Sequence, residues 1–189
     1  MTTDTKTALL DSAEHASRAR GFDGFSYADL AEAVGIRKAS IHYHFPTKAA
    51  LSAALMDRYH ACLERTCAQI DSRHETAAGR LKALIDFYRD ALNGGKTLCL
   101  CVSFIASRES LSDDVKAKIS AFRKMMIDWI RDVYVLGSAD KTIAGITDPA
   151  QEARATLALL EGAHLAARSD ETIEVFDEAV QTLLSRCRP

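Results

Sequence analysis

Apolar residues recur at helical spacing along almost the whole chain. In residues 6–20, Leu9, Leu10, Ala13 and Ala16 form a stripe at i, i+3/i+4 and i+7, with charged residues between them. The same spacing predicts further helices over residues 27–34, 38–45, 47–72, 75–92, 97–108, 113–136, 150–168 and 171–186. No run of alternating β-branched residues indicates a sheet. The pattern therefore predicts an all-α fold of about nine helices.

One stretch leaves the helical pattern ambiguous. The run from Leu98 to Ala106 is apolar enough for a buried strand, but no second candidate strand exists to pair with it. We therefore interpret residues 97–108 as a buried helix. The run is about half of the ~20 residues that a membrane-spanning helix needs, so no contact with a membrane is expected.

Residues 25–51 contain two short helical patterns close together. Ser26 with Asp29 three residues later has the spacing of a capping box, which would start the first helix. Gly35 separates the two patterns and can adopt the positive φ of a tight turn, and Pro46 ends the second. This layout predicts a helix-turn-helix, which places its second helix in the major groove of DNA.

The outward side chains of residues 38–45 have the chemistry that DNA recognition requires. Ala39 and Ser40 are small enough to let the backbone approach base edges. The side chains that we expect to reach phosphates are Arg37, Lys38, His42, Tyr43, His44 and Lys48. Ser26 and Tyr27, at the start of the preceding helix, complete the predicted DNA-contacting set. Any one of these residues alone would fit an ordinary surface helix, but the turn and the following proline favour DNA binding.

Composition narrows the possible functions without supporting DNA binding directly. The formal net charge is −2, so the predicted interface rests on a local pattern and not on a basic surface. The five cysteines are an odd number and lack zinc spacing, and no cofactor or metal site is predicted. The polar first residues do not form a signal peptide, so we expect a cytoplasmic protein. No catalytic constellation or phosphate loop occurs, which argues against an enzyme.

The DNA-binding signature of the TetR/AcrR family of bacterial repressors closely resembles the stretch S-Y-A-D-L-A-E-A-V-G-I-R-K-A-S-I-H-Y-H-F-P-T-K-A-A-L. The resemblance implies a helix-turn-helix DNA-binding domain at residues 1–46 and a helical ligand-binding and dimerisation domain at 47–189. It also implies a homodimer, a palindromic double-stranded operator and an unidentified small-molecule effector. Arg37, Ala39 and His42 depart from the usual serine, glycine and tyrosine of the family.

The last two predicted helices have apolar faces that fit a helix-on-helix dimer interface. The residues predicted for this interface are Leu157, Leu160, Gly162, Ala163, Phe176, Val180 and Leu183. The alternative is that both helices only cover the core of a single chain.

The segment around Cys99 and Cys101 is similar to the region of helices 6 and 7 in repressors of this family that sense electrophiles or oxidants. Arg168 matches a place where such regulators can carry a lysine, and a cation beside a thiol raises the thiolate fraction. The alternative is that both cysteines are small buried hydrophobes. Aromatic or polar groups on otherwise apolar faces are candidate effector contacts or plain core: Tyr59, Tyr88, Phe104, Trp129 and His164.

The sequence therefore predicts a DNA-binding repressor that a small-molecule inducer releases from a palindromic operator. The alternative is a repressor switched by thiol modification at Cys99. A DNA-binding protein whose body binds another protein is the third hypothesis.

Overall fold

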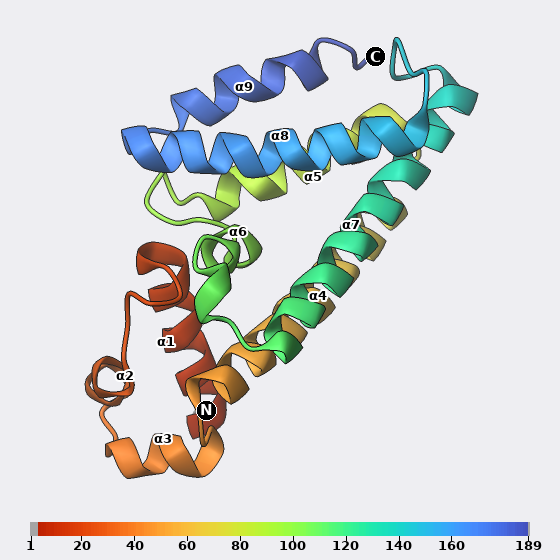
Figure 1. The fold of residues 1–189 in the computed structure, drawn as a ribbon. Helices are drawn as coiled ribbons and strands as arrows, with labels where there is room; N and C mark the ends of the chain where they lie inside the picture. The colour runs from red at the N-terminus through yellow and green to blue at the C-terminus, as the bar shows by residue number, and fades with distance from the viewer. Residues whose placement is uncertain (1–3, 189) are drawn as a thin grey trace. The chain divides into compact units, whose positions relative to one another are not determined.

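The computed structural model describes residues 4–188, and within them the chain forms nine α-helices and one short 3-10 helix, η1 (Figure 1). Their bounds are α1 Thr5–Arg20, α2 Tyr27–Val34, α3 Lys38–His44, α4 Lys48–Arg73, α5 Ala77–Ala91, α6 Leu100–Ile105, η1 Arg108–Ser110, α7 Asp113–Asp140, α8 Pro149–Asp170 and α9 Glu174–Leu184. The predicted all-α fold is confirmed. None of the helices in this range is long and apolar enough to cross a membrane.

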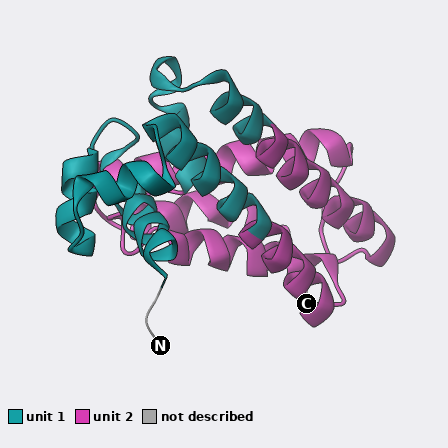
Figure 2. Cartoon of the chain, turned by 90° about the horizontal axis from the view of Figure 1, so that it is seen from below, with its two compact units in different colours: residues 1–61, 100–120 teal, residues 62–99, 121–189 magenta. Residues whose placement is uncertain are grey.

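The chain divides into two compact units (Figure 2). The first unit comprises the chain up to Ala61 together with Leu100–Ser120, and the second comprises Cys62–Cys99 and the chain from Ala121 onward. The first unit therefore contains α6 as well as the helix-turn-helix. The boundary predicted between residues 46 and 47 separates the expected DNA-binding domain from the expected ligand-binding and dimerisation domain, and it stays a prediction.

Side-chain caps begin several helices where the sequence indicates them. The Thr47 hydroxyl accepts a hydrogen bond from the Ala50 N–H at 3.1 Å in the first turn of α4. The Asp148 carboxylate accepts one from the Ala150 N–H at 2.9 Å, and Pro149 occupies the first position of α8. These bonds satisfy backbone donors that have no partner within the helix.

Several helix bounds differ from the sequence-based expectation by a few residues, and the structure explains the differences at α6 and α7. Helix α6 is shorter than the predicted 97–108 because Thr97 and Cys99 hydrogen-bond to groups outside it, the Ala91 carbonyl and the His164 ring. The sequence predicts that α7 ends near Gly137, but the helix continues to Asp140. Gly137 is buried inside the helix, where an added Cβ would lie 3.0 to 3.3 Å from neighbouring side chains.

Within the first unit, α6 packs against α1. The Ser103 hydroxyl donates to the Ser17 carbonyl oxygen at 2.6 Å, and the Phe104 ring meets the edge of Phe22 with 5.5 Å between ring centroids. Within the second unit, α9 packs on α8 and α5. A bidentate ion pair from Arg89 to Asp177, at 2.6 and 2.7 Å, joins α5 to α9.

Candidate nucleic-acid interface

Helix α3 buries one side and exposes the other. Ile41 is fully buried and Phe45, just after the helix, is 3% exposed, as the apolar pattern predicts. Tyr43 is 85% exposed, and its ring lies edge-on to His44 with 5.2 Å between centroids. The Tyr43 ring contributes little to the buried core, so it is available to contact an external partner.

The helix before it starts with the predicted capping box. The Ser26 hydroxyl accepts hydrogen bonds from the N–H groups of Ala28 and Asp29, and Asp29 Oδ2 accepts one from the Ser26 N–H at 2.6 Å. The bonds from the Ser26 backbone and side chain lower the pKa of Asp29 below its ordinary value. The turn that follows has Gly35 at φ 72° and ψ 34°, a left-handed conformation that suits glycine.

Tyr27 is buried within the helix-turn-helix and does not lie on its surface. Its hydroxyl donates to the Phe45 carbonyl oxygen at 2.9 Å, which links the first turn of α2 to the end of α3. Burial raises the pKa of Tyr27 to about 12, so the phenol stays protonated and remains a donor at neutral pH. The His42 ring lies 5.0 Å from the Tyr27 ring, and its Nδ1 is 3.2 Å from the Pro46 carbonyl oxygen. A carbonyl only accepts, so Nδ1 carries the proton in this bond.

Lys48 has a fixed position at the start of α4. Its ammonium donates to the Phe25 carbonyl oxygen at 2.8 Å and lies 4.3 and 4.7 Å from the ring centroids of Phe25 and Phe22. Loss of hydration by burial lowers the pKa of Lys48. An ammonium has three N–H donors, so two remain for a phosphate. Lys48 therefore positions the loop before α2 as well as facing the predicted interface.

Two hollows gather the sequence-predicted residues. The first has a volume of about 390 Å³, and its lining residues are Phe25, Ser26, Tyr27, Lys38, His42, Thr47 and Lys48. The second has a volume of about 450 Å³, and its lining residues are Thr5, Ile36, Ala39, Ser40, Tyr43 and His44. Among the described residues no carboxylate lines either hollow, although the charges of Asp23 and Asp29 act on Lys48.

Arg37 lines neither hollow; it precedes α3 as its N-cap residue and is exposed. Sequence reasoning missed Thr5, Ile36 and Thr47. Ile36 follows the Gly35 turn and Thr47 follows Pro46, and these positions could have suggested that both lie beside α3. Nothing in the sequence near Thr5 indicates that α1 begins beside α3.

The predicted effector and sensor residues divide between the two units. Tyr59, Cys101 and Phe104 belong to the first unit and are buried, and the others belong to the second. Cys99 is 2% exposed, so its thiol is shielded from reagents in this conformation. In the second unit, the Arg168 guanidinium donates to Glu171 at 3.1 Å, and Trp129 Nε1 donates to Asp71 Oδ2 at 3.0 Å.

His164 is fully buried and links three segments of the second unit. Its Nδ1 accepts a hydrogen bond from the Cys99 N–H at 3.2 Å, and its Nε2 is 2.9 Å from the Tyr88 carbonyl oxygen. A backbone N–H only donates and a carbonyl only accepts, so the ring is neutral with its proton on Nε2. The rings of Tyr88 and Phe176 enclose it at 5.3 and 5.6 Å between centroids. His164 therefore holds the residue that precedes α6.

The residues predicted for a dimer interface lie mostly inside the single chain. Six of them are buried, at 5% exposure or less: Leu157, Leu160, Ala163, Phe176, Val180 and Leu183. Gly162 is exposed, and an added Cβ there would meet nothing within 4 Å. The six buried residues therefore pack within their own chain, and Gly162 is the exposed member of the predicted set.

Comparison with known proteins identifies the region that contains the helix-turn-helix. Residues 9–55 match the profile of the family described as "Bacterial regulatory proteins, tetR family". The chain is 32% identical over 72 residues to the HTH-type transcriptional regulator TtgR of Pseudomonas putida, a match covering 38% of this chain and 34% of TtgR. The chain thus matches about a third of the length of the curated relatives.

The likeness in fold extends over the whole chain. A TetR-family transcriptional regulator from Agrobacterium tumefaciens has a TM-score of 0.91 and 26% identity over 97% of both chains. The reduced form of NemR from E. coli has a TM-score of 0.82 and 24% identity over 98% of both chains, a likeness of fold alone. TetR proteins are regulators and not enzymes. Residues 9–55 carry the signature of the tetR family of bacterial regulatory proteins, and the chain around them has the fold of a TetR-family transcriptional regulator.

Proposed function

We propose that the protein is a transcriptional repressor that binds a palindromic double-stranded operator as a homodimer and is released by a small-molecule inducer. The observation that carries the proposal is the exposed side of α3, where Tyr43 is 85% exposed beside the hollow that Ala39 and Ser40 line. Lys38 and Lys48 are among the residues that line the other hollow. Small residues suit base edges and cations suit phosphates, so the two hollows fit the parts of a duplex.

A palindromic operator requires two helix-turn-helix domains that are related by a two-fold axis. The exposed side of α8 offers a surface for the second copy, because Ala158, Gly162 and Leu165 follow one another at i, i+4 and i+7 and all are exposed. Leu165 is 50% exposed, which is unusual for a large apolar side chain without a partner. We place the dimer contact on this side of α8, next to the buried residues that the apolar pattern indicated.

Light scattering tests the dimer contact with two matched variants. Leu165→Glu should give the mass of one 20.7 kDa chain, while the wild-type protein gives twice that mass. Ala121→Glu, which adds the same charge at an exposed position of α7, should remain a dimer. A dimeric Leu165→Glu protein would move the contact away from α8.

A second candidate function is electrophile or oxidant sensing through Cys99. The observation that favours it is the hydrogen bond from the Cys99 N–H to His164, because a modified thiol beside that bond would disturb the segment leading into α6. The thiol is buried, so modification requires a transient opening of this segment. Cys99→Ser should retain repression and lose its response to electrophiles; an unchanged response would leave the inducer non-covalent.

The DNA-binding proposal is tested by selecting bound fragments from sheared genomic DNA and footprinting them. We expect a symmetric footprint whose half-sites are separated by about one helical turn or a multiple of it. Affinity should fall steeply with salt, because phosphate contacts release counterions. Fragments without two-fold symmetry, or binding indifferent to salt, would contradict the proposal. A thermal-shift screen of metabolites and electrophiles, with and without the selected duplex, then identifies the inducer.

A further inference from the structure

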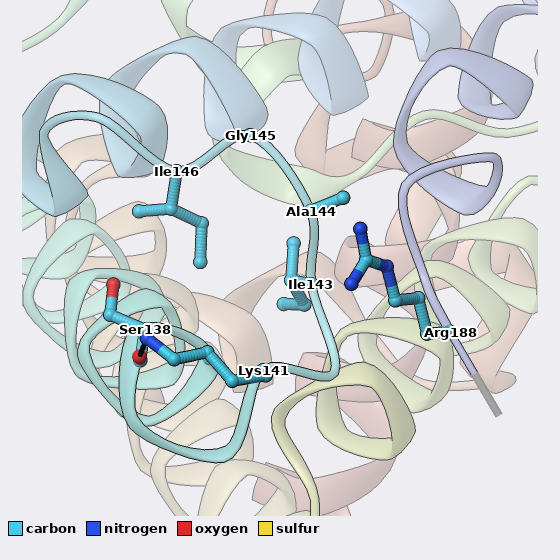
Figure 3. Close-up of a pocket in the computed structure, with 8 residues that line it drawn as sticks. Ser138, Lys141, Ile143, Ala144, Gly145, Ile146 and Arg188 are labelled. Carbon is cyan, nitrogen blue, oxygen red and sulfur yellow. Dashed lines mark hydrogen bonds between the residues drawn. The ribbon is translucent and has the colours of Figure 1, made fainter.

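The second unit contains a cavity of about 230 Å³ far along the chain from the helix-turn-helix (Figure 3). Three segments line it: the last turn of α7 with Gly137 and Ser138, the connection to α8 with Lys141 and residues 143–146, and Arg188. Neither the predicted DNA contacts nor the predicted effector residues are among them.

Backbone hydrogen bonds hold the residues after α9 against this connection. The Ala144 N–H donates to the Arg186 carbonyl oxygen at 2.9 Å, and the Arg188 N–H donates to the Thr142 carbonyl oxygen at 2.8 Å. Two further bonds, both 2.8 Å, join the Arg186 guanidinium to Glu152 at the start of α8. Hydrogen bonds therefore hold the backbone of Arg188 beside the cavity.

The charges at the cavity are positive and lack carboxylate partners. Lys141 and Arg188 are the charged lining residues, and neither forms an ion pair within residues 4–188. The adjacent carboxylates are already engaged: Asp140 accepts bonds from the Ala77 and Thr142 N–H groups, and Glu152 pairs with Arg186. An anion in the cavity would meet two cations, and no carboxylate of residues 4–188 lines it.

The apolar part of the lining comes from Ile143, Ala144 and Ile146. Ile143 is 4% exposed, and Figure 3 shows its side chain and that of Ile146 standing beside the cavity from the same connection. A Cβ at Gly137 would lie 3.0 and 3.2 Å from the terminal methyls of Ile146 and Ile143, so the glycine leaves room for both. Glycine inside a helix costs about 1 kcal/mol relative to alanine, and this packing offsets part of that cost.

Lys141 has a left-handed backbone, with φ 62°, at the position after α7 where glycine or asparagine is usual. Its ammonium donates to the Ser138 carbonyl oxygen, so the side chain folds over the last turn of α7 towards the cavity. The strain of a left-handed lysine is tolerated because the Ala77 and Thr142 bonds to Asp140 hold the surrounding backbone.

We propose that this cavity binds a small organic carboxylate with a short apolar chain. The carboxylate would pair with Arg188 and Lys141, and the chain would contact Ile143 and Ile146. The volume lies at the small end for ligand pockets, which limits the ligand to a few carbons. Ile143, Ala144 and Ile146 offer an alkyl chain apolar contacts that inorganic phosphate does not make, which favours the organic carboxylate. The site is independent of the DNA-binding proposal.

Butyrate is the probe, followed by NMR of the full-length protein labelled at the isoleucine δ1 methyls. We expect the Ile143 and Ile146 signals to shift with a Kd on the order of 1 mM, since both cations are solvent-accessible. Butyramide, which has the same chain without the charge, should shift them little. Arg188→Gln and Lys141→Gln should each weaken butyrate binding by about tenfold, as expected for loss of a hydrogen bond to a charged group.

Arg154→Gln is the matched control, because Arg154 is an exposed arginine of α8 that does not line the cavity. It should bind butyrate as the wild-type protein does. Absent shifts at millimolar butyrate, or equal weakening in Arg154→Gln, would overturn the site. Shifts of the same size and midpoint with inorganic phosphate would overturn the assignment to an organic carboxylate.

Discussion

Helices α3 and α8 use their surfaces differently. Helix α3 has seven residues and buries only Ile41, so nearly all its side chains are available to a partner. Helix α8 has 22 residues and buries seven of them against its own unit, while its other side exposes Gly162 and Leu165. On α3, most substitutions should therefore affect binding without affecting stability. On α8, a substitution should affect stability or binding according to the side of the helix on which it lies.

The largest expected effect distinguishes the two sides of α8. Leu160 is fully buried, so Leu160→Ala should lower the free energy of unfolding by about 3 kcal/mol through lost burial and a cavity. Leu165 is half exposed, and Leu165→Ala should lower it by less than about 1 kcal/mol in the monomeric protein. Urea unfolding at low protein concentration measures both. Equal losses would mean that α8 has no outward side.

Substitution of Lys48 should affect both the stability of the helix-turn-helix region and its binding to DNA. Lys48→Ala removes the bond to Phe25 and the contacts with two aromatic rings, for a loss of about 1 to 2 kcal/mol in the free energy of unfolding. Lys38→Ala, at an exposed position of α3, should leave that free energy unchanged. Thermal unfolding of both variants checks this, and an unaltered Lys48→Ala protein would show that its contacts are incidental.

The capping box should matter less and should depend on pH. Ser26→Ala removes the acceptor for two N–H groups and should cost about 1 kcal/mol. The pKa of Asp29 is lower in the folded chain than its ordinary 3.8, so its ionised form stabilises α2 above that pH. This contribution is lost as the pH falls through the folded pKa. The stability difference between wild type and Asp29→Asn should therefore shrink in acid; a difference that persists at low pH would contradict this.

The smallest expected effect is a difference in reaction rate among the cysteines of the wild-type protein, which involves no change in stability. Cys62 is exposed and should react with N-ethylmaleimide first. Cys67 is buried, and burial raises the pKa of its thiol to about 12, so it should react slowly. Cys99 and Cys101 are buried and should react only through opening of the native state. Peptide mapping by mass spectrometry orders the rates; a Cys99 as fast as Cys62 would favour thiol sensing.

The sequence predicted short, one-sided helices best. The bounds of α2 agree with the prediction, because Ser26 and Gly35 determine its ends through local backbone chemistry. The predicted end of α7 was wrong because the space that suits Gly137 comes from residues that follow it by up to nine positions and from Ala77. Local patterns do not report such contacts.

The candidate site shows the same limit. The outward position of Tyr43 follows from the helical period, whereas the bond from Lys48 to the Phe25 carbonyl depends on how two segments meet. Helix α8 has apolar residues on both sides, so its pattern could not indicate which side is buried. The pairing of residues 142–144 with 186–188 has no sequence signal, because it depends on backbone groups alone.

The central claim is that the exposed side of α3 binds DNA, and one measurement tests it directly. The affinity of a selected duplex for the wild-type protein and for Tyr43→Ala combined with Lys38→Ala is compared by fluorescence anisotropy, alongside thermal unfolding. We expect affinity to fall at least tenfold, about 1.4 kcal/mol or more, with unfolding temperature unchanged. Undiminished affinity in the folded variant would contradict the assignment of α3 as the DNA-binding helix.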